Sequence, residues 1–418
     1  MKILTLSSFD LTGGAGKAAF RLSQALRDSG VDLQMEVQSR SGDAFWVTES
    51  TKGLNKVANR LRPTLDRLPL RLYPSYSGAS WSSNLLPRRV NLATRNFSAQ
   101  LVHLHWIGYG FIPISALCKF ALPIVWTLHD SWTFTGGCHV PGDCRQYMDN
   151  CGHCPQLGSH SQFDLSRLVL RCKAAYWRNL NLCLVAPSRW LASTARQSSL
   201  FHEREIHVIP NGLDLQLFRP LDPLQCRKLL NLPLDKKLIV FGAVSPFGDS
   251  NKGCDHLRLA IDRLALAKDQ ANFELVIFGP RSTQDTLFAL PSHYVGQIRD
   301  ELTMAILLSA ADVTVVPSRS ENLSNIIMES LACGTPVACF DIGGNSDMVD
   351  HLDNGYLARP YDAADLAKGI RWITHSEEHT VNLRQNARSK CVKEFAIEDV
   401  AQRYLKLYET VIATSKPI

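Results

Sequence analysis

The feature that most constrains the fold is a repeated alternation of short apolar segments with stretches at helical spacing. Apolar strands are predicted at residues 2–6, 101–105, 124–128 and 182–186, and again at 238–241, 275–278, 313–316 and 336–340. Such alternation is typical of a mostly parallel sheet covered by helices on both faces. Because the pattern restarts after Pro210-Asn211-Gly212, we expect two doubly wound α/β domains.

The chain length also favours two domains. At 418 residues it exceeds the size at which one hydrophobic core usually keeps growing. We expect residues 1–195 to form a first Rossmann-like domain and residues 205–389 a second, with an amphipathic C-terminal helix within 390–418 packing back on the first. Open parallel sheets bind ligands at the carboxyl ends of their strands, so two such domains facing each other would form one cleft.

The start of the chain does not predict a targeting segment, and its longest apolar stretch does not predict a membrane-spanning helix. The start, Met1 to Ser8, does not have the pattern of a signal peptide, so we expect a cytoplasmic protein. The longest apolar stretch, from Phe111 to Leu128, is interrupted by two prolines and a lysine. It therefore predicts a short helix and a buried strand rather than a membrane span.

One segment has a local excess of positive charge. From Lys52 to Arg95 there are nine basic residues and one acid, Asp66, with Tyr73, Tyr76, Trp81 and Phe97 interleaved or adjacent. This pattern suits peripheral association with the inner membrane surface or a phosphate-bearing acceptor. The alternative is a solvated face beside a few core aromatics. Nucleic acid is not expected as a partner, because no nucleic-acid-binding signature accompanies the charge.

A glycine-bearing turn, Gly13-Gly14-Ala15-Gly16, lies between the first strand and a helix expected from about Lys17. Glycines let backbone N–H groups approach an anion at a helix N-terminus, so the turn is a candidate phosphate cradle. The spacing Gly14-x-Gly16-x-x-Ala19 also fits a dinucleotide fingerprint, but the second strand ends at Ser39 without the acidic ribose anchor. An NAD-type Rossmann enzyme stays open as an alternative.

The most informative segment runs from Pro317 to Val337 and reads as strand end, helix and next strand. With Asn322 or Ser324 as the N-cap, Glu321 precedes the helix and Glu329 lies about two turns inside it. Eight residues at helical rise separate the two carboxylates by roughly 12 Å, about the span from a sugar across a diphosphate to a ribose. The alternative makes Glu321 a complement to the helix dipole and Glu329 a surface residue.

This segment resembles the Glu-x7-Glu motif of retaining glycosyltransferases of family four, which have the two-domain GT-B fold. Further pieces resemble the same family in the same order and cover most of the chain. They are the glycine turn, Thr127-Leu128-His129-Asp130, Ala186-Pro187-Ser188, Ile209-Pro210-Asn211-Gly212-Leu213-Asp214 and Asn251-Lys252-Gly253.

The resemblance implies a role for each matching residue. Glu321 would contact the donor hexose, Glu329 would contact its ribose, and Asn322, Leu323 and Ser324 would complete this part of the donor site. Lys252 would hold the leaving diphosphate, Gly14 would approach from the opposite domain, and His129 would stand beside the reacting sugar. The chain departs from the family at Gly242-Ala243, where an arginine is common, and at Glu321-Asn322-Leu323-Ser324, where Glu-Gly-Phe-Gly is common.

The resemblance also implies the reaction. A hexose would pass from a nucleotide-diphosphate sugar to a glycan or lipid-linked acceptor in cell-surface polysaccharide synthesis, with retention of configuration. The acceptor would attack on the face from which the phosphate departs, and fixed positive charge would make a metal unnecessary for the chemistry. His129 could instead accept a proton, or be a strand-end histidine bound to a backbone carbonyl. A nucleotide-sugar-binding protein without turnover is the alternative from another class.

Four of the twelve cysteines, Cys138, Cys144, Cys151 and Cys154, fall within seventeen positions directly after His129 and Asp130. Cysteine clusters of this kind suit a structural zinc ion, with His139 and His153 as spare ligands. Disulfides are disfavoured in a cytoplasmic protein, and a loop of reduced thiols is the alternative. The other cysteines are expected to be small core residues.

Overall fold

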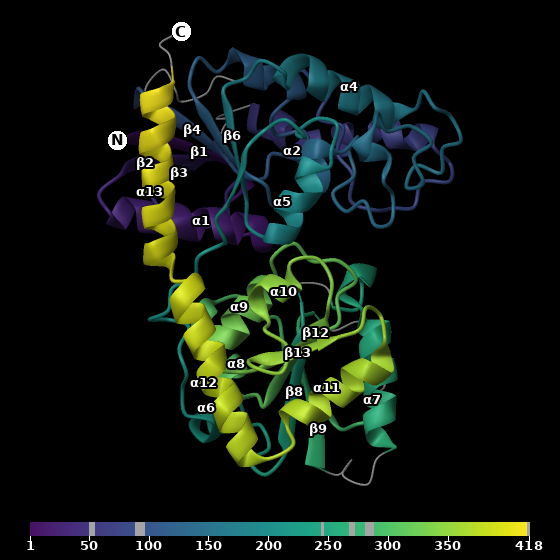
Figure 1. Ribbon diagram of the computed structural model, residues 1–418, viewed down its shortest axis with the longest axis vertical. Helices are drawn as coiled ribbons and strands as arrows, with labels where there is room; N and C mark the ends of the chain where they lie inside the picture. The colour runs from purple at the N-terminus through teal and green to yellow at the C-terminus, as the bar shows by residue number, and fades with distance from the viewer. Residues whose placement is uncertain (50–54, 88–96, 244–245, 267–271, 281–287, 416–418) are drawn as a thin grey trace. The chain divides into compact units, whose positions relative to one another are not determined.

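A computed structural model describes residues 1–49, 55–87, 97–243, 246–266, 272–280 and 288–415. The chain divides into two compact units (Figure 1). Unit 1 comprises Met1–Asn211 and Val400–Ile418, and unit 2 comprises Gly212–Asp399. The ranges expected from the sequence, 1–195 with 390–418 and 205–389, differ from these units at their ends.

Unit 1 is built on a parallel seven-stranded sheet with the order β3-β2-β1-β4-β5-β6-β7. Its strands are β1 (Lys2–Phe9), β2 (Asp32–Ser39), β3 (Val47–Glu49), β4 (Leu101–Leu104), β5 (Ile124–Thr127), β6 (Leu182–Ala186) and β7 (Ile206–Val208). Its α-helices are α1 (Gly13–Asp28), α2 (Asn55–Asp66), α4 (Leu165–Trp177), α5 (Arg189–Arg196) and α13 (Ile397–Thr414), and its 3-10 turns are η1 (Leu68–Leu72), η2 (Ile114–Lys119), η3 (Ser131–Phe134) and η4 (Gln146–Met148).

The last helix, α13, packs on the sheet of unit 1, far from it in sequence. Its residues Val400, Tyr404 and Tyr408 are buried in one cluster with β1 and β2 residues. The hydroxyls of Tyr404 and Thr127 lie 2.8 Å apart, which ties the helix to the end of β5. The helical spacing of these apolar residues made this element predictable, and Figure 1 shows the yellow α13 beside the unit 1 strands.

The first helix begins earlier than the sequence suggested. It starts at Gly13 with Thr12 as the N-cap, so the glycine turn is the first turn of α1 rather than a loop before Lys17. Glycines are poor predictors of helix because they lower helix propensity by about 1 kcal/mol. At Gly16 an added Cβ would lie 3.1 Å from the carbonyl oxygen of Asp10, so the small residue allows the helix to start directly against the end of β1.

Unit 2 contains a parallel six-stranded sheet with the order β10-β9-β8-β11-β12-β13. The strands are β8 (Lys237–Gly242), β9 (Phe273–Phe278), β10 (Ser292–Gly296), β11 (Val313–Val316), β12 (Val337–Phe340) and β13 (Gly355–Ala358). The helices are α6 (Pro223–Leu229), η5 (Ser250–Lys252), α7 (Cys254–Ala265), α8 (Glu301–Ala310), α9 (Asn325–Ala332), α10 (Asn345–Met348), α11 (Ala363–Ile373) and α12 (Glu377–Glu394).

The central strands of unit 2 are buried on both faces, as their continuous apolar sequence predicts. One cluster of buried side chains joins β8, β11 and β12 to α8, α9 and α12, and another joins the strands to α7 and α11. The two Rossmann-like α/β units therefore confirm the predicted fold class.

The basic segment is divided by the fold. Trp81 and Phe97 are buried, while Tyr73 and Tyr76 pack partly buried against the same core, so these aromatics are packing residues and do not form an exposed surface. Lys52, Arg88, Arg89 and Arg95 lie outside the described residues. Phe111 to Leu128 contains η2 and β5, as expected. In the described ranges, no helix is both long and apolar enough to cross a membrane.

Candidate active site

In unit 2, the predicted site residues meet where the strand order of the sheet reverses. Strands β8 and β11 are neighbours, and the chain continues from them toward opposite edges of the sheet. In parallel sheets, this switch point leaves a crevice beyond the carboxyl ends of the two strands. Lys252 lies in the connection after β8, and Glu321 lies in the connection after β11.

Lys252 and Glu321 form an ion pair at this point. The Nζ of Lys252 donates to Oε1 of Glu321 at 2.7 Å, and the two side chains are 31% and 14% exposed. Burial alone would lower the pKa of Lys252, but the Glu321 carboxylate holds it above its ordinary value. The lysine is therefore positively charged at neutral pH and reaches solvent, where an anionic ligand can meet it.

Two hydrogen bonds hold the loop that carries Lys252 against the loop that carries Glu321. The side-chain amide of Asn251 donates to the carbonyl oxygen of Ser320 at 2.9 Å, and the N–H of Arg319 donates to the carbonyl oxygen of Asn251 at 2.8 Å. Gly253 has a φ of +65°, and a Cβ added there would lie 1.9 Å from the carbonyl oxygen of Pro317. Only glycine permits this approach, which explains the Asn-Lys-Gly sequence in physical terms.

A second glycine supports Glu321 from the loop after β12. Gly343 has a φ of +54°, and an added Cβ would lie 1.8 Å from the carbonyl oxygen of Glu321. The N–H of Gly344 donates to the same oxygen at 3.1 Å. This support was not predicted from the sequence, although the Gly343-Gly344 pair, which begins three residues after the end of a buried strand, was the available signal.

The helix after Glu321 begins at Asn325, with Ser324 as its N-cap. Ser324 is one of the two N-caps that the sequence predicted. Glu329 is the fifth residue of α9, so it lies about one turn inside the helix rather than two, and the residues from Glu321 to Ser324 are not helical. Glu329 is 5% exposed, so it is not the surface residue of the alternative interpretation.

The intervening residues differ in what they offer a ligand. Asn322 is partly exposed, Ser324 is buried at the helix start, and Leu323 belongs to the apolar core of unit 2. Leu323 can therefore meet a donor through its backbone but not through its side chain. Ser324 makes no side-chain capping hydrogen bond, which leaves the start of α9 without the usual hydroxyl cap.

In unit 1, the corresponding switch point lies between β1 and β4. The loop after β1 leads to Gly14, which is exposed in the first turn of α1. Buried Asp10 holds this loop against the end of β2, because its carboxylate accepts backbone hydrogen bonds from Leu11 and Ser41 at 2.8 Å. Strand β2 ends at Ser39 and is followed by Arg40, so no carboxylate stands where an NAD ribose would need one.

His129 lies two residues after the end of β5, and one of its partners is another histidine. The Nδ1 of His105 and the Nε2 of His129 lie 2.9 Å apart. Burial lowers the pKa of His129 to about 4 and that of His105 well below the ordinary value. Both rings are therefore neutral near pH 7.

The surroundings of the second ring nitrogen of His105 indicate which nitrogen of that ring carries the proton. Its Nε2 is buried without a hydrogen-bond partner in the described part of the chain. Burying an unpaired N–H costs more than burying an unpaired lone pair, which favours the proton of His105 on Nδ1. That N–H then donates to Nε2 of His129, so Nε2 of His129 is an occupied acceptor.

The neighbouring residue Asp130 organises the segment that follows. Its carboxylate accepts from the N–H of Trp132 at 2.8 Å and meets Nδ1 of His139 at 2.6 Å. Burial alone would raise the pKa of Asp130, but His139 and these hydrogen bonds hold it below its usual range. Since the Nε2 of His139 is 2.9 Å from Oγ of Ser82, both of its ring nitrogens are engaged.

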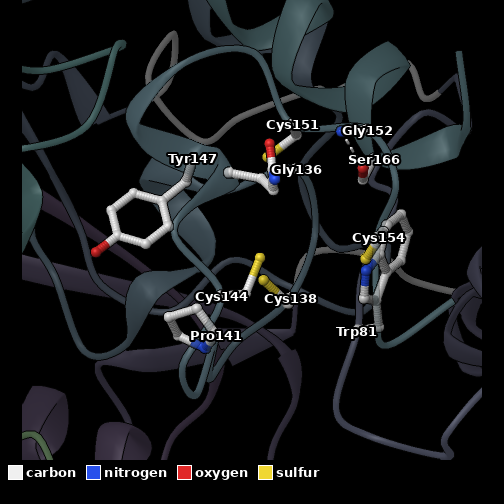
Figure 2. A pocket seen from close by; sticks show the side chains of 11 residues that line it. Trp81, Gly136, Cys138, Pro141, Cys144, Tyr147, Cys151, Gly152, Cys154 and Ser166 are labelled. Atoms are coloured by element: carbon white, nitrogen blue, oxygen red, sulfur yellow. Dashed lines mark hydrogen bonds between the residues drawn. The ribbon is translucent and has the colours of Figure 1, made fainter. Parts of the chain in front are cut away.

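The four clustered cysteines lie together on one cavity of unit 1, as Figure 2 shows. Burial raises the pKa of Cys151 to about 12 and raises those of Cys138 and Cys154. Over the described ranges, no group of three or more His, Cys, Asp or Glu side chains is arranged to hold a metal ion. The thiols thus share a cavity without being gathered around one point.

Two protein families match the chain, one over each unit. Residues 12–217 match Glycosyltransferase Family 4, and residues 227–390 match Glycosyl transferases group 1. A D-inositol 3-phosphate glycosyltransferase of Acidothermus cellulolyticus is 33% identical over 381 residues, which cover 86% of this chain and 77% of that protein.

A second relative matches a shorter stretch. The N,N'-diacetylbacillosaminyl-diphospho-undecaprenol alpha-1,3-N-acetylgalactosaminyltransferase of Campylobacter jejuni is 30% identical over 220 residues. This match covers 50% of the chain and 56% of that relative, so it spans little more than half of the relative's length. The crystal structure of HepE from Anabaena in complex with UDP-glucose superposes with a TM-score of 0.65 at 18% identity, covering 98% of this chain and all of that one.

These matches argue against the NAD-type alternative. They agree instead with two Rossmann-like units, each with a switch point that carries the predicted residues. The chain belongs to glycosyltransferase family 4 and has the GT-B fold.

Proposed function

We propose that the protein transfers a hexose from a nucleotide-diphosphate sugar to a glycan or lipid-linked acceptor, with retention of anomeric configuration, in cell-surface polysaccharide synthesis. The observation that carries the proposal is the Lys252–Glu321 ion pair at the switch point of unit 2. The relatives support the substrate classes, because HepE binds UDP-glucose and the Campylobacter relative is named for an acceptor on diphospho-undecaprenol.

Lys252 would neutralise the departing diphosphate. An ammonium group has three donors, so Lys252 can bond phosphate oxygens while Glu321 remains nearby. The backbone N–H groups at the start of α9 would add positive potential beside it. Because these positive groups are already in place, they need not reorganise when the bond to the sugar breaks. The proposed chemistry therefore needs no divalent metal.

Glu321 and Glu329 would bind hydroxyls at opposite ends of the donor. Glu321 uses Oε1 for Lys252, which leaves its second oxygen to accept from a hexose hydroxyl. Glu329 lies buried on α9 and would accept from the ribose hydroxyls. Asn322 and the backbone of Leu323 and Ser324 would line the part between them.

His129 would orient the reacting sugar rather than accept a proton. A histidine with a pKa near 4 is a weak base at neutral pH, and its Nε2 is occupied by His105. The acceptor's proton would then pass to an oxygen of the departing phosphate on the same face of the sugar. Gly14 would let the first turn of α1 approach the ligands closely.

The acceptor side would lie at the inner surface of the cytoplasmic membrane. Leu61 and Leu65 of α2 and Leu68 and Leu72 of η1 form a sequence of exposed leucines, with exposed fractions of 53%, 41%, 41% and 80%. Arg67 and Arg71 are exposed beside them. Exposed leucines with arginines suit the interface of an anionic leaflet, so this leucine stripe would dock the protein peripherally.

A donor screen with paired variants tests the proposed reaction. UDP-, GDP- and ADP-sugars are incubated with the full chain, and nucleotide release and anomeric configuration of the product are measured. We expect Lys252→Ala and Glu321→Gln each to lower kcat about 100-fold to 1,000-fold. Lys228→Ala removes an exposed lysine of α6 and should keep full activity. Binding without turnover by the wild-type protein, or equal rates for Lys252→Ala and Lys228→Ala, would refute the proposal.

A further inference from the structure

The cavity in unit 1 that holds four cysteines is a separate feature from the proposed reaction. It is lined by Cys138, Cys144, Cys151 and Cys154 together with Trp81. The volume of the cavity is about 20 Å³. That is room for one water molecule or one ion. Figure 2 shows the side chains of Cys138, Cys144, Cys151 and Cys154 around this cavity, with Trp81 and Tyr147.

The loop that supplies these cysteines has little regular structure to hold it. Between η3, which ends at Phe134, and α4, which begins at Leu165, the chain forms a single 3-10 turn, η4. Loops of this length without their own secondary structure are uncommon in compact domains. Cys151, Gly152 and His153 follow one another with positive φ values of 53°, 102° and 45°, a run that persists only when surrounding contacts enforce it.

Backbone N–H groups already point at two of the sulfurs. The N–H groups of Gln156 and Leu157 are within hydrogen-bonding reach of Sγ of Cys154, and that of Gly136 reaches Sγ of Cys151. Such donors stabilise a thiolate more than a thiol. In the absence of a metal these sulfurs remain protonated thiols, because burial outweighs the backbone donors and raises the pKa of Cys151 and Cys154.

A buried lysine lies beside the cavity. Lys173 on α4 is completely buried, and its Nζ donates to the carbonyl oxygens of Trp132 and Thr135 and lies 3.8 Å from the centre of the Trp132 ring. Within the described residues it has no carboxylate partner in ion-pair range. Burial lowers the pKa of Lys173 to about 7, so the amine is not a fixed positive charge near neutral pH.

We propose that Cys138, Cys144, Cys151 and Cys154 bind one structural zinc ion. Four thiolates and Zn²⁺ form a centre of charge −2, whose negative charge would favour the protonated amine of Lys173. Binding requires the cysteine side chains to turn toward the cavity centre, and the four thiols release four protons as the Zn–S bonds form. His139 is excluded as a ligand because Asp130 and Ser82 occupy its ring nitrogens.

The zinc centre would hold the loop against the segment that follows His129. Lys173 connects the two, because the carbonyls that it binds belong to η3 and to Thr135 directly after it. With four protein ligands the ion has no open position for water, so its role is structural.

Metal analysis of the full-length protein tests the proposal without any substrate. Purified under reducing conditions, the wild-type chain should contain one equivalent of zinc by mass spectrometry, which a thiol-blocking mercurial releases. Cys144→Ser should lose most of this zinc, whereas Cys118→Ser, an exposed cysteine outside the cluster, should keep it.

A second measurement covers the case in which Cys144→Ser does not fold. Wild-type protein in which Co²⁺ replaces zinc should show the sulfur-to-cobalt charge-transfer bands and tetrahedral spectrum of a tetrathiolate site. Folded wild-type protein without stoichiometric metal would overturn the proposal. So would a disulfide among the four cysteines after reducing purification, or equal zinc contents in Cys144→Ser and Cys118→Ser.

Discussion

Gly253→Ala should damage the proposed donor site although residue 253 contacts no reacting atom. The added Cβ would lie 1.9 Å from the carbonyl oxygen of Pro317, so the two loops must separate by about 1 Å before the contact reaches 3.0 Å. The positive φ adds about 1–2 kcal/mol, and forcing the packed loops apart adds about 1–3 kcal/mol. We expect unit 2 to lose about 2–5 kcal/mol of unfolding free energy.

The same displacement moves Lys252 relative to Glu321. A shift of about 1 Å in a positioned catalytic group can lower a rate about 100-fold, so kcat for sugar transfer should fall by about that factor. Urea denaturation and initial-rate kinetics on the same preparations measure the two effects.

Gly296→Ala is the matched control for this prediction. Gly296 also has a positive φ, +77°, but an added Cβ there meets nothing within 4 Å. It should lose only about 1–2 kcal/mol and keep wild-type kcat. If both variants lose the same stability and keep the same kcat, the steric argument for the interlocked loops is wrong.

Two further predictions concern unit 1. The native pKa of His129, about 4, lies below its ordinary value of 6.5, so between these values the unfolded chain binds a proton that the native ring does not. The free energy of unfolding should therefore fall as pH drops through this window. Urea denaturation at several pH values measures the slope of that free energy against pH, and His129→Gln should reduce the slope by an amount that corresponds to at most about one proton. An unchanged slope would contradict the assigned pKa. Replacing Leu65 and Leu68 with serine should weaken binding to anionic vesicles about tenfold for each leucine in a flotation assay, whereas Leu229→Ser, on an exposed leucine of unit 2, should not; equal binding by both proteins would exclude the leucine stripe as the docking surface.

The parallel sheets were predictable because their signal is local. Buried strands such as Val313–Val316 are short apolar runs bounded by polar residues, and α13 shows its buried face through the spacing of Val400, Tyr404 and Tyr408. Lys252 and Glu321 were singled out by motif, and strand order places both at one switch point.

The local geometry of the site depends on contacts that the sequence does not display. The backbone at Glu321 is held by Gly344, a partner more than twenty residues away, whose N–H donates to the Glu321 carbonyl oxygen. One partner of His129 is His105, which directly follows β4 and is brought close by the pairing of β4 with β5.

The end of β8 explains why positive charge in the donor site would rest on Lys252. Many family members carry an arginine near Gly242-Ala243, but here a Cβ at residue 242 would lie 2.3 Å from the carbonyl oxygen of Phe278 on β9. Residue 242 must therefore remain glycine, and Ala243 brings no charge. The connection after β8 instead brings Lys252 to Glu321, and Gly253 fixes that connection against Pro317. Removal of this one lysine should consequently be more damaging here than where an arginine shares the diphosphate.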